Sequence, residues 1–317
     1  MEYKRILVTG ANGFIGRNLC SFLKEKGYFI RAAVRNNSRD ISGVREYVQI
    51  SDIDRSTDWR EAVKDIDCVV HLAGRAHVTD KREVYNQVNV LGTQRLAEQA
   101  AHNGVKRFVF ISSIKVNGDG GVFAEESRPE PKDHYAVSKL EAEKKVIFVC
   151  RNSNMQEIIL RLPLVYGPGV KANFLQLIRL VDNGVPLPFG SIHNKRSLIY
   201  VGNLCDIIGL CILHSAVVGQ IFLISDGIDL STPQLISMIA KGLNNKAFLL
   251  PCPLLFLRII GILSGRSATI KRLHDSLCVQ TTKFSNLTGW KPRFSPEEGI
   301  AETVRFYKRC GNMSTQK

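Results

Sequence analysis

Residues 5–35 read RILVTGANGFIGRNLCSFLKEKGYFIRAAVR, and this stretch decides the fold. A mostly apolar run at 5–10 ends in glycine, a helix-forming run follows at 17–27, and a second apolar run covers 29–35. A strand, a glycine turn, a helix and a second strand in this order make a β-α-β crossover, which is right-handed in nearly all proteins. We therefore predict two parallel strands joined by this helix.

The same alternation continues to about residue 165. Further strands are expected at 46–50, 68–74, 107–113, 157–163 and 219–227, and further helices at 89–104 and 135–150. Several of these strands are almost continuously apolar, as parallel strands covered on both faces are. We predict the α/β class: a doubly wound, Rossmann-like parallel sheet with a smaller mixed α/β C-terminal substrate lobe.

The turn-rich sequence after Pro163 sets the expected domain boundaries. We expect residues 1–165 and about 200–227 to form the dinucleotide-binding domain. The substrate-binding lobe would then comprise 166–199 and 228–317. It should cover the carboxyl edge of the sheet, where ligands bind in such folds.

The 317 residues carry 43 basic and 29 acidic side chains, a formal net charge of +14. Such an excess suits an anionic partner. Because the basic residues are spread along the chain, we expect a small anionic ligand and no nucleic acid. The eight cysteines form no CxxC pair and no cluster with histidine. We therefore expect no metal site, no disulfide framework and a cytoplasmic location.

The most apolar stretch is AFLLPCPLLFLRIIGIL at 247–263, which Pro251, Pro253 and Arg258 interrupt. It is too short and too broken to span a bilayer, so no integral membrane segment is expected. A buried or amphipathic helix after the prolines is favoured, with peripheral membrane contact as the minor alternative.

Three glycines at positions 10, 13 and 16 lie between the first strand and the first helix. Gly10 permits a tight turn, Gly13 lets the backbone approach a pyrophosphate, and Gly16 lets helix and strand pack closely. The helix N-terminus then offers free N–H groups and partial positive charge to the phosphates. The turn therefore predicts a dinucleotide site.

Arg35 closes the second strand, where the residue faces the adenosine ribose of a bound dinucleotide. A guanidinium suits a ribose 2′-phosphate, whereas a carboxylate suits a free 2′-hydroxyl. NADP(H) is therefore favoured, and NAD(H) remains possible because a guanidinium can also stack on adenine.

Tyr135 and Lys139 lie four residues apart in a predicted helix, so both project from one face. An ammonium beside the phenol would stabilise the phenolate and lower the pKa of Tyr135 from about 10. Tyrosine then becomes a usable acid or base. A serine at the end of the neighbouring strand, Ser112 or Ser113, can hold the reacting oxygen.

These motifs resemble those of the extended short-chain dehydrogenases/reductases, in particular the nucleotide-sugar epimerase/dehydratase group. The resemblance runs through nearly the whole chain and rests on TGANGFIG at 9–16, DID at 52–54, VVHLAG at 69–74, NVLGT at 89–93, FISSIKVNG at 110–118, YAVSK at 135–139, LRLPLVYGPG at 160–169 and KRSLIYVGNL at 195–204. It implies that Ser113, Tyr135 and Lys139 form the catalytic triad. Ser112 is next in line, since the register depends on aligning VNG with the family's VYG.

The resemblance also implies binding residues. Those expected at the cofactor are Gly10, Asn12, Gly13, Phe14, Ile15, Arg35, Asp52, Ile53, Leu72, Ala73, Gly74, Asn89, Ser112, Tyr135, Lys139 and Pro163. Those expected at a UDP-sugar substrate are Arg75, His77, Lys115, Asn173, Phe189, Arg196 and Arg272. Phe189 would cover the uracil ring, with a place in the core as the alternative, and Arg196 would bind the diphosphate. Related enzymes often pair through the helices at 89–104 and 135–150, so a homodimer is expected.

Three reactions share this scaffold: 4,6-dehydration, 4-epimerisation and ketone reduction. Dehydratases resemble one another in an Asp-Glu pair just after the catalytic hydroxyl, and here Ile114 and Lys115 stand there. Dehydration is therefore disfavoured. Epimerases generally hold NAD tightly and carry an acidic residue after the second strand, where this chain has Arg35. That residue favours a reductase supplied with NADPH.

The string from HLAGRAHV to VNG also resembles bacterial 4-ketoreductases that form UDP-N-acetylquinovosamine. The leading hypothesis is thus NAD(P)H-dependent reduction of the 4-keto group of a UDP-linked 2-acetamido-2,6-dideoxyhexos-4-ulose, in the synthesis of surface polysaccharide such as lipopolysaccharide. The alternative is an NAD-dependent 4-epimerase of a UDP-hexose or UDP-N-acetylhexosamine. A non-enzymatic alternative is an NADP-binding scaffold.

Overall fold

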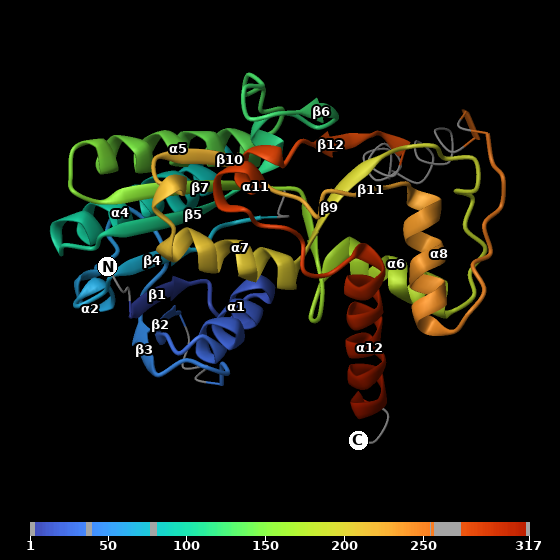
Figure 1. Ribbon diagram of the computed structural model, residues 1–317, viewed down its shortest axis with the longest axis horizontal. Coiled ribbons are helices and arrows are strands. Elements are labelled where there is room, and N and C mark those ends of the chain that lie inside the picture. Colours follow the sequence, from blue (N-terminus) through green and yellow to red (C-terminus); the bar gives the residue numbers. More distant parts are fainter. Residues whose placement is uncertain (1–3, 36–39, 77–80, 254, 257–273, 315–317) are drawn as a thin grey trace.

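Seven parallel strands form the central sheet, in the order β10-β7-β5-β4-β1-β2-β3 (Figure 1). The strands are β1 (Arg5–Thr9), β2 (Phe29–Val34), β3 (Glu46–Gln49), β4 (Cys68–His71), β5 (Arg107–Ser113), β7 (Gln156–Leu162) and β10 (Gln220–Leu223). Each of the seven strand ranges expected from the sequence overlaps one of them, and β7 begins one residue earlier than expected. The strand order reverses between β1 and β4, and ligands bind at such a switch point. The predicted doubly wound α/β fold is confirmed.

The computed structural model describes residues 4–35, 40–76, 81–253, 255–256 and 274–314, with side chains up to residue 310. Within these ranges, none of the helices combines the length and the apolar character needed to cross a bilayer.

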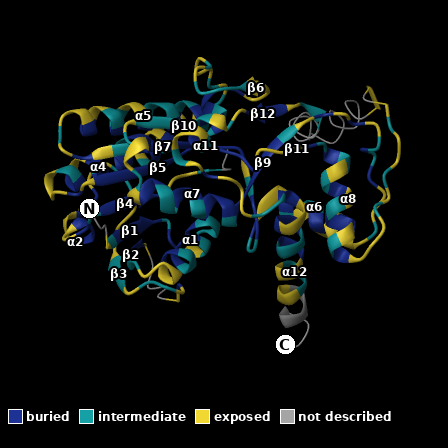
Figure 2. Ribbon diagram, in the orientation of Figure 1, coloured by how far each residue is buried: buried dark blue, intermediate teal, exposed yellow. Residues whose placement is uncertain are grey.

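Helices cover both faces of the central sheet (Figures 1 and 2). Successive residues of β1 point to opposite faces: Ile6 and Val8 belong to one buried cluster, and Leu7 to the other. The first cluster includes side chains of α1 (Phe14–Glu25) and α7 (Val201–Leu213). The second includes side chains of α2 (Arg60–Val63), α4 (Thr93–His102) and α5 (His134–Arg151). Strands buried on both faces explain the apolar runs in the sequence.

One long helical stretch precedes β5. It comprises α3 (Arg82–Tyr85), the π-helical turn η1 (Asn86–Gly92) and α4. The helix expected at 89–104 therefore starts earlier than the sequence indicated and contains a π-helical turn. Such turns are rare and occur frequently at functional sites.

A second, mixed sheet has the order β11-β9-β12-β6, and β8 pairs with β9 beside it. Its strands are β6 (Gly121–Phe123), β8 (Leu164–Tyr166), β9 (Arg196–Tyr200), β11 (Asp229–Leu230) and β12 (Leu277–Val279). The helices around it are α6 (Ala172–Asp182), α8 (Thr232–Leu243) and α12 (Pro296–Ser314). A further helix, α11 (Thr282–Thr288), packs on β10 of the central sheet, where the rings of Phe284 and Phe222 are 5.1 Å apart. Two short 3₁₀ turns are η2 (Ile114–Val116) and η3 (Ser215–Val217). β6 lies within residues 1–165 of the sequence but pairs with β12 in this sheet.

Candidate active site

The glycine turn at residues 10–16 has the geometry that its sequence indicates. Gly10 has φ of +67°, and a Cβ there would lie 2.9 Å from the amide nitrogen of Ala73. A Cβ on Gly16 would lie 2.3 Å from the carbonyl oxygen of Gly10. Both positions therefore require glycine. Gly13 is the N-cap of α1 and no side chain caps this helix end. A cradle of this shape, at the positive end of a twelve-residue helix, fits an anionic diphosphate.

The other residues expected at the cofactor lie around this turn or at the same edge of the sheet. Phe14 and Ile15 pack partly buried against the core, as does Leu72 after β4. Asn12 is exposed. Pro163 is buried between β7 and β8.

Asn89 holds the loop that follows β4. Its side-chain oxygen accepts a hydrogen bond from the backbone N–H of Arg75 at 2.8 Å, and its amide group donates to the Arg75 carbonyl at 3.1 Å. The same amide group donates to the hydroxyl of Ser138 on α5 at 2.9 Å. Asn89 is buried, and Gly74 lies directly against its side chain. Asn89 therefore connects the loop at residues 73–75 to the helix that carries Tyr135.

The loops after β2 and β3 meet through Arg35 and Asp52. The guanidinium of Arg35 donates to the Asp52 carboxylate at 3.3 Å, and the two side chains are 63% and 84% exposed. Ile53 lies against the π-helical turn, where a Cβ on Gly92 would come within 2.4 Å of its Cγ2. Because β1, β2 and β3 are parallel, these residues lie at the same sheet edge as the glycine turn.

Ser113 and Tyr135 are in contact. Ser113 is the last residue of β5 and Tyr135 lies in the first turn of α5, where the Ser113 hydroxyl is near enough to the phenol to lower its pKa. Burial raises the pKa of Tyr135 to about 12, and the hydrogen bond to Ser113 acts in the opposite direction. The ring of Tyr85 lies beside that of Tyr135, with centroids 6.2 Å apart. The phenol is therefore protonated at neutral pH.

Lys139 has a different partner from the one expected. Its ammonium donates to the carbonyl oxygen of Ile111 at 2.6 Å and lies 4.2 Å from the ring centroid of Phe110. Burial lowers the pKa of Lys139 to about 8, which Glu143 opposes. The expectation that Lys139 lowers the pKa of Tyr135 is wrong for this structure, because desolvation dominates and the ammonium is bonded to strand β5.

Ser112 points into a buried ion-pair network. Its hydroxyl donates to the carboxylate of Glu143, which also accepts from the guanidinium of Arg161 at 2.6 Å and 3.0 Å. Arg161 in turn donates to the side-chain oxygen of Asn117 at 3.0 Å. All four side chains are at most 4% exposed. Adjacent strand residues face opposite ways, so Ser112 is directed into this network and Ser113 toward Tyr135.

The residues expected at the substrate are more scattered. Lys115 forms ion pairs with Asp133, which caps α5, and with Asp119 at 3.4 Å. Arg196 opens β9 and donates to the carbonyl of Asp275 at 3.0 Å. Arg75 is exposed beside the Asn89 clamp.

Phe189 departs from its expected role. It is 8% exposed and belongs to the hydrophobic core, which favours the alternative that Phe189 is a core residue. Asn173 is exposed at the start of α6. His77 and Arg272 lie outside the described residues.

His71 was not expected at the site. It ends β4 and bridges the hydroxyls of Thr9, 2.7 Å from Nδ1, and Thr93, 2.9 Å from Nε2. Its ring stacks on Phe110, whose ring also contacts the Lys139 ammonium. Burial and the charge of Lys139 lower the pKa of His71 to about 3. A histidine at the end of a buried strand in VVHLAG was the available signal.

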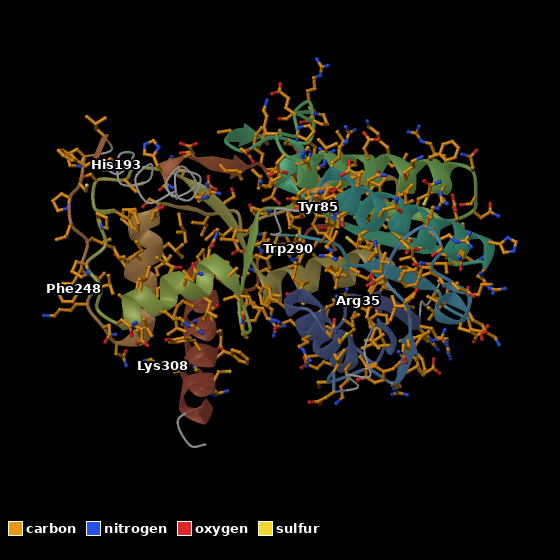
Figure 3. The ribbon with its side chains drawn as sticks, turned by 180° about the vertical axis from the view of Figure 1, so that it is seen from behind. Arg35, Tyr85, His193, Phe248, Trp290 and Lys308 are labelled. Atoms are coloured by element: carbon orange, nitrogen blue, oxygen red, sulfur yellow. The ribbon has the colours of Figure 1, made fainter. Side chains whose placement is uncertain are left out.

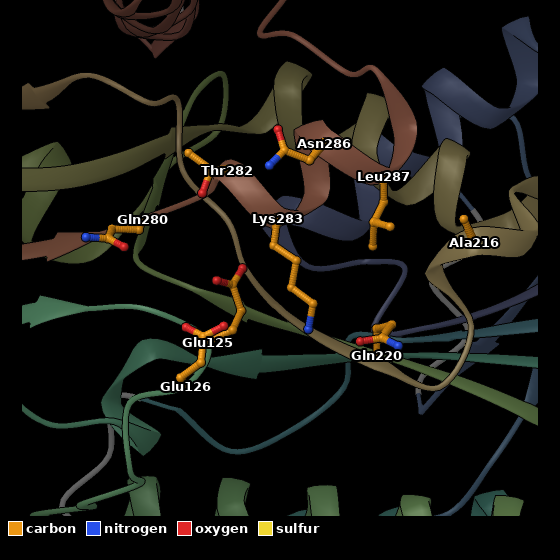
Figure 4. A pocket seen from close by; sticks show the side chains of 9 residues that line it. All are labelled: Glu125, Glu126, Ala216, Gln220, Gln280, Thr282, Lys283, Asn286 and Leu287. Atoms are coloured by element: carbon orange, nitrogen blue, oxygen red, sulfur yellow. The ribbon is translucent and has the colours of Figure 1, made fainter.

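Two open pockets lie away from the glycine turn. One, of about 520 Å³, adjoins the edge strand β10 (Figure 4). Its lining includes Glu125, whose carboxyl pKa burial raises, and Lys283. The other, also about 520 Å³, is lined by His193, His274 and Asp275 among others, next to Arg196. Among the described residues, no three potential metal ligands gather into a site.

Comparisons with known proteins agree with this architecture. A family model described as the NAD dependent epimerase/dehydratase family matches residues 6–225. The chain is 42% identical over 320 residues to a UDP-glucose 4-epimerase of Vibrio cholerae, covering 98% of this chain and 97% of that protein.

More distant relatives also match along most of their length. An N-acetyl-alpha-D-glucosaminyl-diphospho-ditrans,octacis-undecaprenol 4-epimerase of Escherichia coli O157:H7 is 26% identical, covering 95% of this chain and 94% of that protein. The protein in the solved structure of MoeE5 in complex with UDP-glucuronic acid and NAD is 26% identical in sequence to this chain. It superposes with a TM-score of 0.79, covering 96% of this chain and 99% of that one. The specific resemblance to 4-ketoreductases is not confirmed by these relatives.

Proposed function

Because the chain belongs to the NAD-dependent epimerase/dehydratase family, we propose that this enzyme is an NAD-dependent 4-epimerase of UDP-hexoses. The observation that carries the choice of reaction is the 42% identity, along 98% of the chain, to a UDP-glucose 4-epimerase. This replaces 4-keto reduction, which the sequence favoured, as the leading interpretation. UDP-glucose and UDP-galactose are the proposed substrate pair, with the N-acetylated sugars as the alternative.

Tyr135 and Ser113 are the proposed catalytic residues. Tyr135 would accept the proton of the sugar C4 hydroxyl as the C–H bond at C4 breaks, and would return it after the C–H bond forms on the opposite face. Ser113 would hold the C4 oxygen through the hydroxyl that now contacts Tyr135. Bound NAD would supply the hydride acceptor and donor. Lys139 would bind the nicotinamide ribose after leaving the Ile111 carbonyl.

NAD is proposed rather than NADP. The guanidinium of Arg35 pairs with the carboxylate of Asp52, so the charge at this edge is balanced. A ribose 2′-phosphate would meet that carboxylate as well as the guanidinium, whereas a free 2′-hydroxyl can donate to it. Gly10, Gly13 and Gly16 would cradle the diphosphate, and the Asp52–Ile53 backbone would border the adenine.

Dehydration is disfavoured by the geometry as well as by the sequence. Ile114 is buried, and the ammonium of Lys115 pairs with Asp119 and Asp133. An alkyl group cannot transfer a proton, and the ammonium is engaged by two carboxylates. Neither position supplies the acid and base that loss of water requires.

Two structural assignments accompany this function. Residues 1–165 and about 200–227 would bind the cofactor, and residues 166–199 and 228–317 the UDP-sugar, through Arg196 and Asn173. The chain would form a homodimer through α4 and α5. This contact would bury the ring of Phe148 on α5, which is 65% exposed in the single chain. Light scattering on the purified protein measures this assembly.

The function is tested by incubating the enzyme with UDP-glucose, UDP-galactose or UDP-N-acetylglucosamine and no added cofactor. Formation of the C4 epimer, detected by proton NMR, supports the proposal if Tyr135→Phe abolishes it. Mass spectrometry of the nucleotide retained through purification should find NAD. Consumption of NADPH with a UDP-linked 4-keto-6-deoxy sugar, without epimerisation, would instead establish the reductase. Turnover of none of these compounds would favour the scaffold.

A further inference from the structure

Exposed apolar side chains lie together in one segment at the end of the second lobe, and we call this set the apolar edge. Its members are Phe248, Leu250, Leu255 and Phe256, which are 53%, 52%, 68% and 58% exposed. They follow α8 in the sequence, and this segment runs along the end of the molecule opposite the central sheet (Figure 1). Phe248 lies at that end, far along the molecule from Arg35 (Figure 3). Exposed apolar groups this close together in one segment mark an interaction surface.

Backbone hydrogen bonds between Leu187 and the segment around Leu249 determine which side chains of this segment face outward. The N–H of Leu187 donates to the Phe248 carbonyl at 2.8 Å, and the N–H of Leu250 donates to the Leu187 carbonyl at 2.9 Å. The segment is therefore extended, and alternate side chains face opposite ways. Leu249 packs against the core, whereas Lys246, Phe248 and Leu250 are exposed. The outward face thus combines two large apolar groups with one ammonium.

The charge of the surrounding sequence is entirely positive. Between Asp229 and Asp275 there is no aspartate or glutamate, so all 29 acidic residues of the chain lie outside positions 230–274. The same stretch contains six basic residues: Lys241, Lys246, Arg258, Arg266, Lys271 and Arg272. Lys241 and Lys246 are the two within the described residues, and both are exposed. An exposed apolar edge within an acid-free, basic stretch matches the chemistry of an anionic lipid surface.

We propose that the apolar edge docks this enzyme on the surface of an anionic bilayer. Phe248, Leu250, Leu255 and Phe256 enter the boundary between headgroups and acyl chains, and Lys246 contacts the lipid phosphates. The charge also argues against a second copy of the chain as the partner, because a symmetric contact through this edge would bring the Lys246 ammonium groups of both copies to one interface. The inference does not depend on the proposed function.

Sedimentation of the full chain with lipid vesicles tests the proposal. Vesicles of phosphatidylcholine mixed with phosphatidylglycerol should bind the protein, and vesicles of phosphatidylcholine alone should bind it at least about tenfold less. Added salt should weaken the binding because it screens the charges. The double variant Phe248→Ser/Leu250→Ser should lose at least about tenfold in affinity. Ile228→Ser is the matched control, since Ile228 is also 53% exposed.

A second pair of variants tests the charge. Lys246→Glu should weaken binding to the anionic vesicles, and Lys64→Glu, an exposed lysine on the central-sheet half, should not. The proposal is overturned if the wild type binds neither vesicle, or if Ile228→Ser and the double variant lose affinity equally. It is also overturned if the double variant dissociates an oligomer in light scattering while vesicle binding is unchanged. Circular dichroism confirms that each variant is folded.

Discussion

The two adjacent serines at the end of β5 allow the site to be tested with a matched pair of substitutions. Ser113→Ala removes the hydroxyl that contacts Tyr135. Removal of one group that holds a reacting oxygen typically lowers kcat by about 10²–10³, or about 3–4 kcal/mol. The stability cost should be small, since Ser113 otherwise accepts only a 3.3 Å bond from the Lys115 N–H. We expect a change below about 1 kcal/mol in the free energy of unfolding.

Ser112→Ala should have the opposite profile. Ser112 is 4% exposed and donates to Glu143, so its loss leaves a buried carboxylate with one partner fewer. We expect a loss of about 1–3 kcal/mol in the free energy of unfolding. Because Glu143 keeps both of its bonds to Arg161, kcat should stay within about tenfold of the wild type.

Epimerisation rates and urea unfolding of the two variants decide the outcome. Both substitutions delete one hydroxyl from neighbouring residues of the same strand, so each serves as the control for the other. The reasoning is refuted if Ser112→Ala loses kcat by about 10²–10³ at unchanged stability while Ser113→Ala remains active. In that case the catalytic register is shifted by one residue.

Three further predictions concern the groups beneath the site. Glu143→Leu leaves the Arg161 guanidinium buried without a carboxylate, and urea unfolding should show a loss of about 3–5 kcal/mol, largely recovered when Arg161 is also made apolar. Gly92→Ala places a Cβ 2.4 Å from Ile53, so the displaced loop should reduce the NAD retained per purified chain. For His71, the folded pKa of about 3 lies below the unfolded value of about 6.5. Stability should therefore fall with decreasing pH below about 6.5, with a contribution approaching about 1.4 kcal/mol per pH unit that is absent in His71→Asn.

The central sheet could be predicted from sequence because its signals are local. Each strand is a short apolar run, and the glycine turn reports its own geometry through Gly10 and Gly16. The second sheet could not be predicted in the same way. β6 and β12 have three residues each and pair across about half of the chain, so nothing in either segment alone indicates its partner. Pairing of this kind depends on the folded chain rather than on local propensity.

In the candidate site, too, the local features could be predicted from sequence and the features that depend on the folded chain could not. Sequence spacing placed Tyr135 and Lys139 on one helix face, and the choice of Ser113 over Ser112 rested on aligning VNG with the family's VYG. The spacing of residues in the sequence does not show which side chains are buried. Phe189 lies in a turn-rich sequence that suggested an exposed ring, yet residues distant in the sequence enclose it in the core.

The spacing of Tyr135 and Lys139 in the sequence does not show how burial changes the pKa of Tyr135. A pKa of about 12 leaves about one phenol in 10⁵ ionised at pH 7, so free Tyr135 is ready to give a proton but not to accept one. A catalytic base at this position therefore needs a positive charge brought to it when ligands bind. The Lys139 ammonium belongs to the next turn of the same helix but is held by the Ile111 carbonyl, an acceptor that a ribose hydroxyl can replace. Cofactor binding and activation of Tyr135 would then be the same event, and an enzyme without its cofactor would hold an inactive phenol.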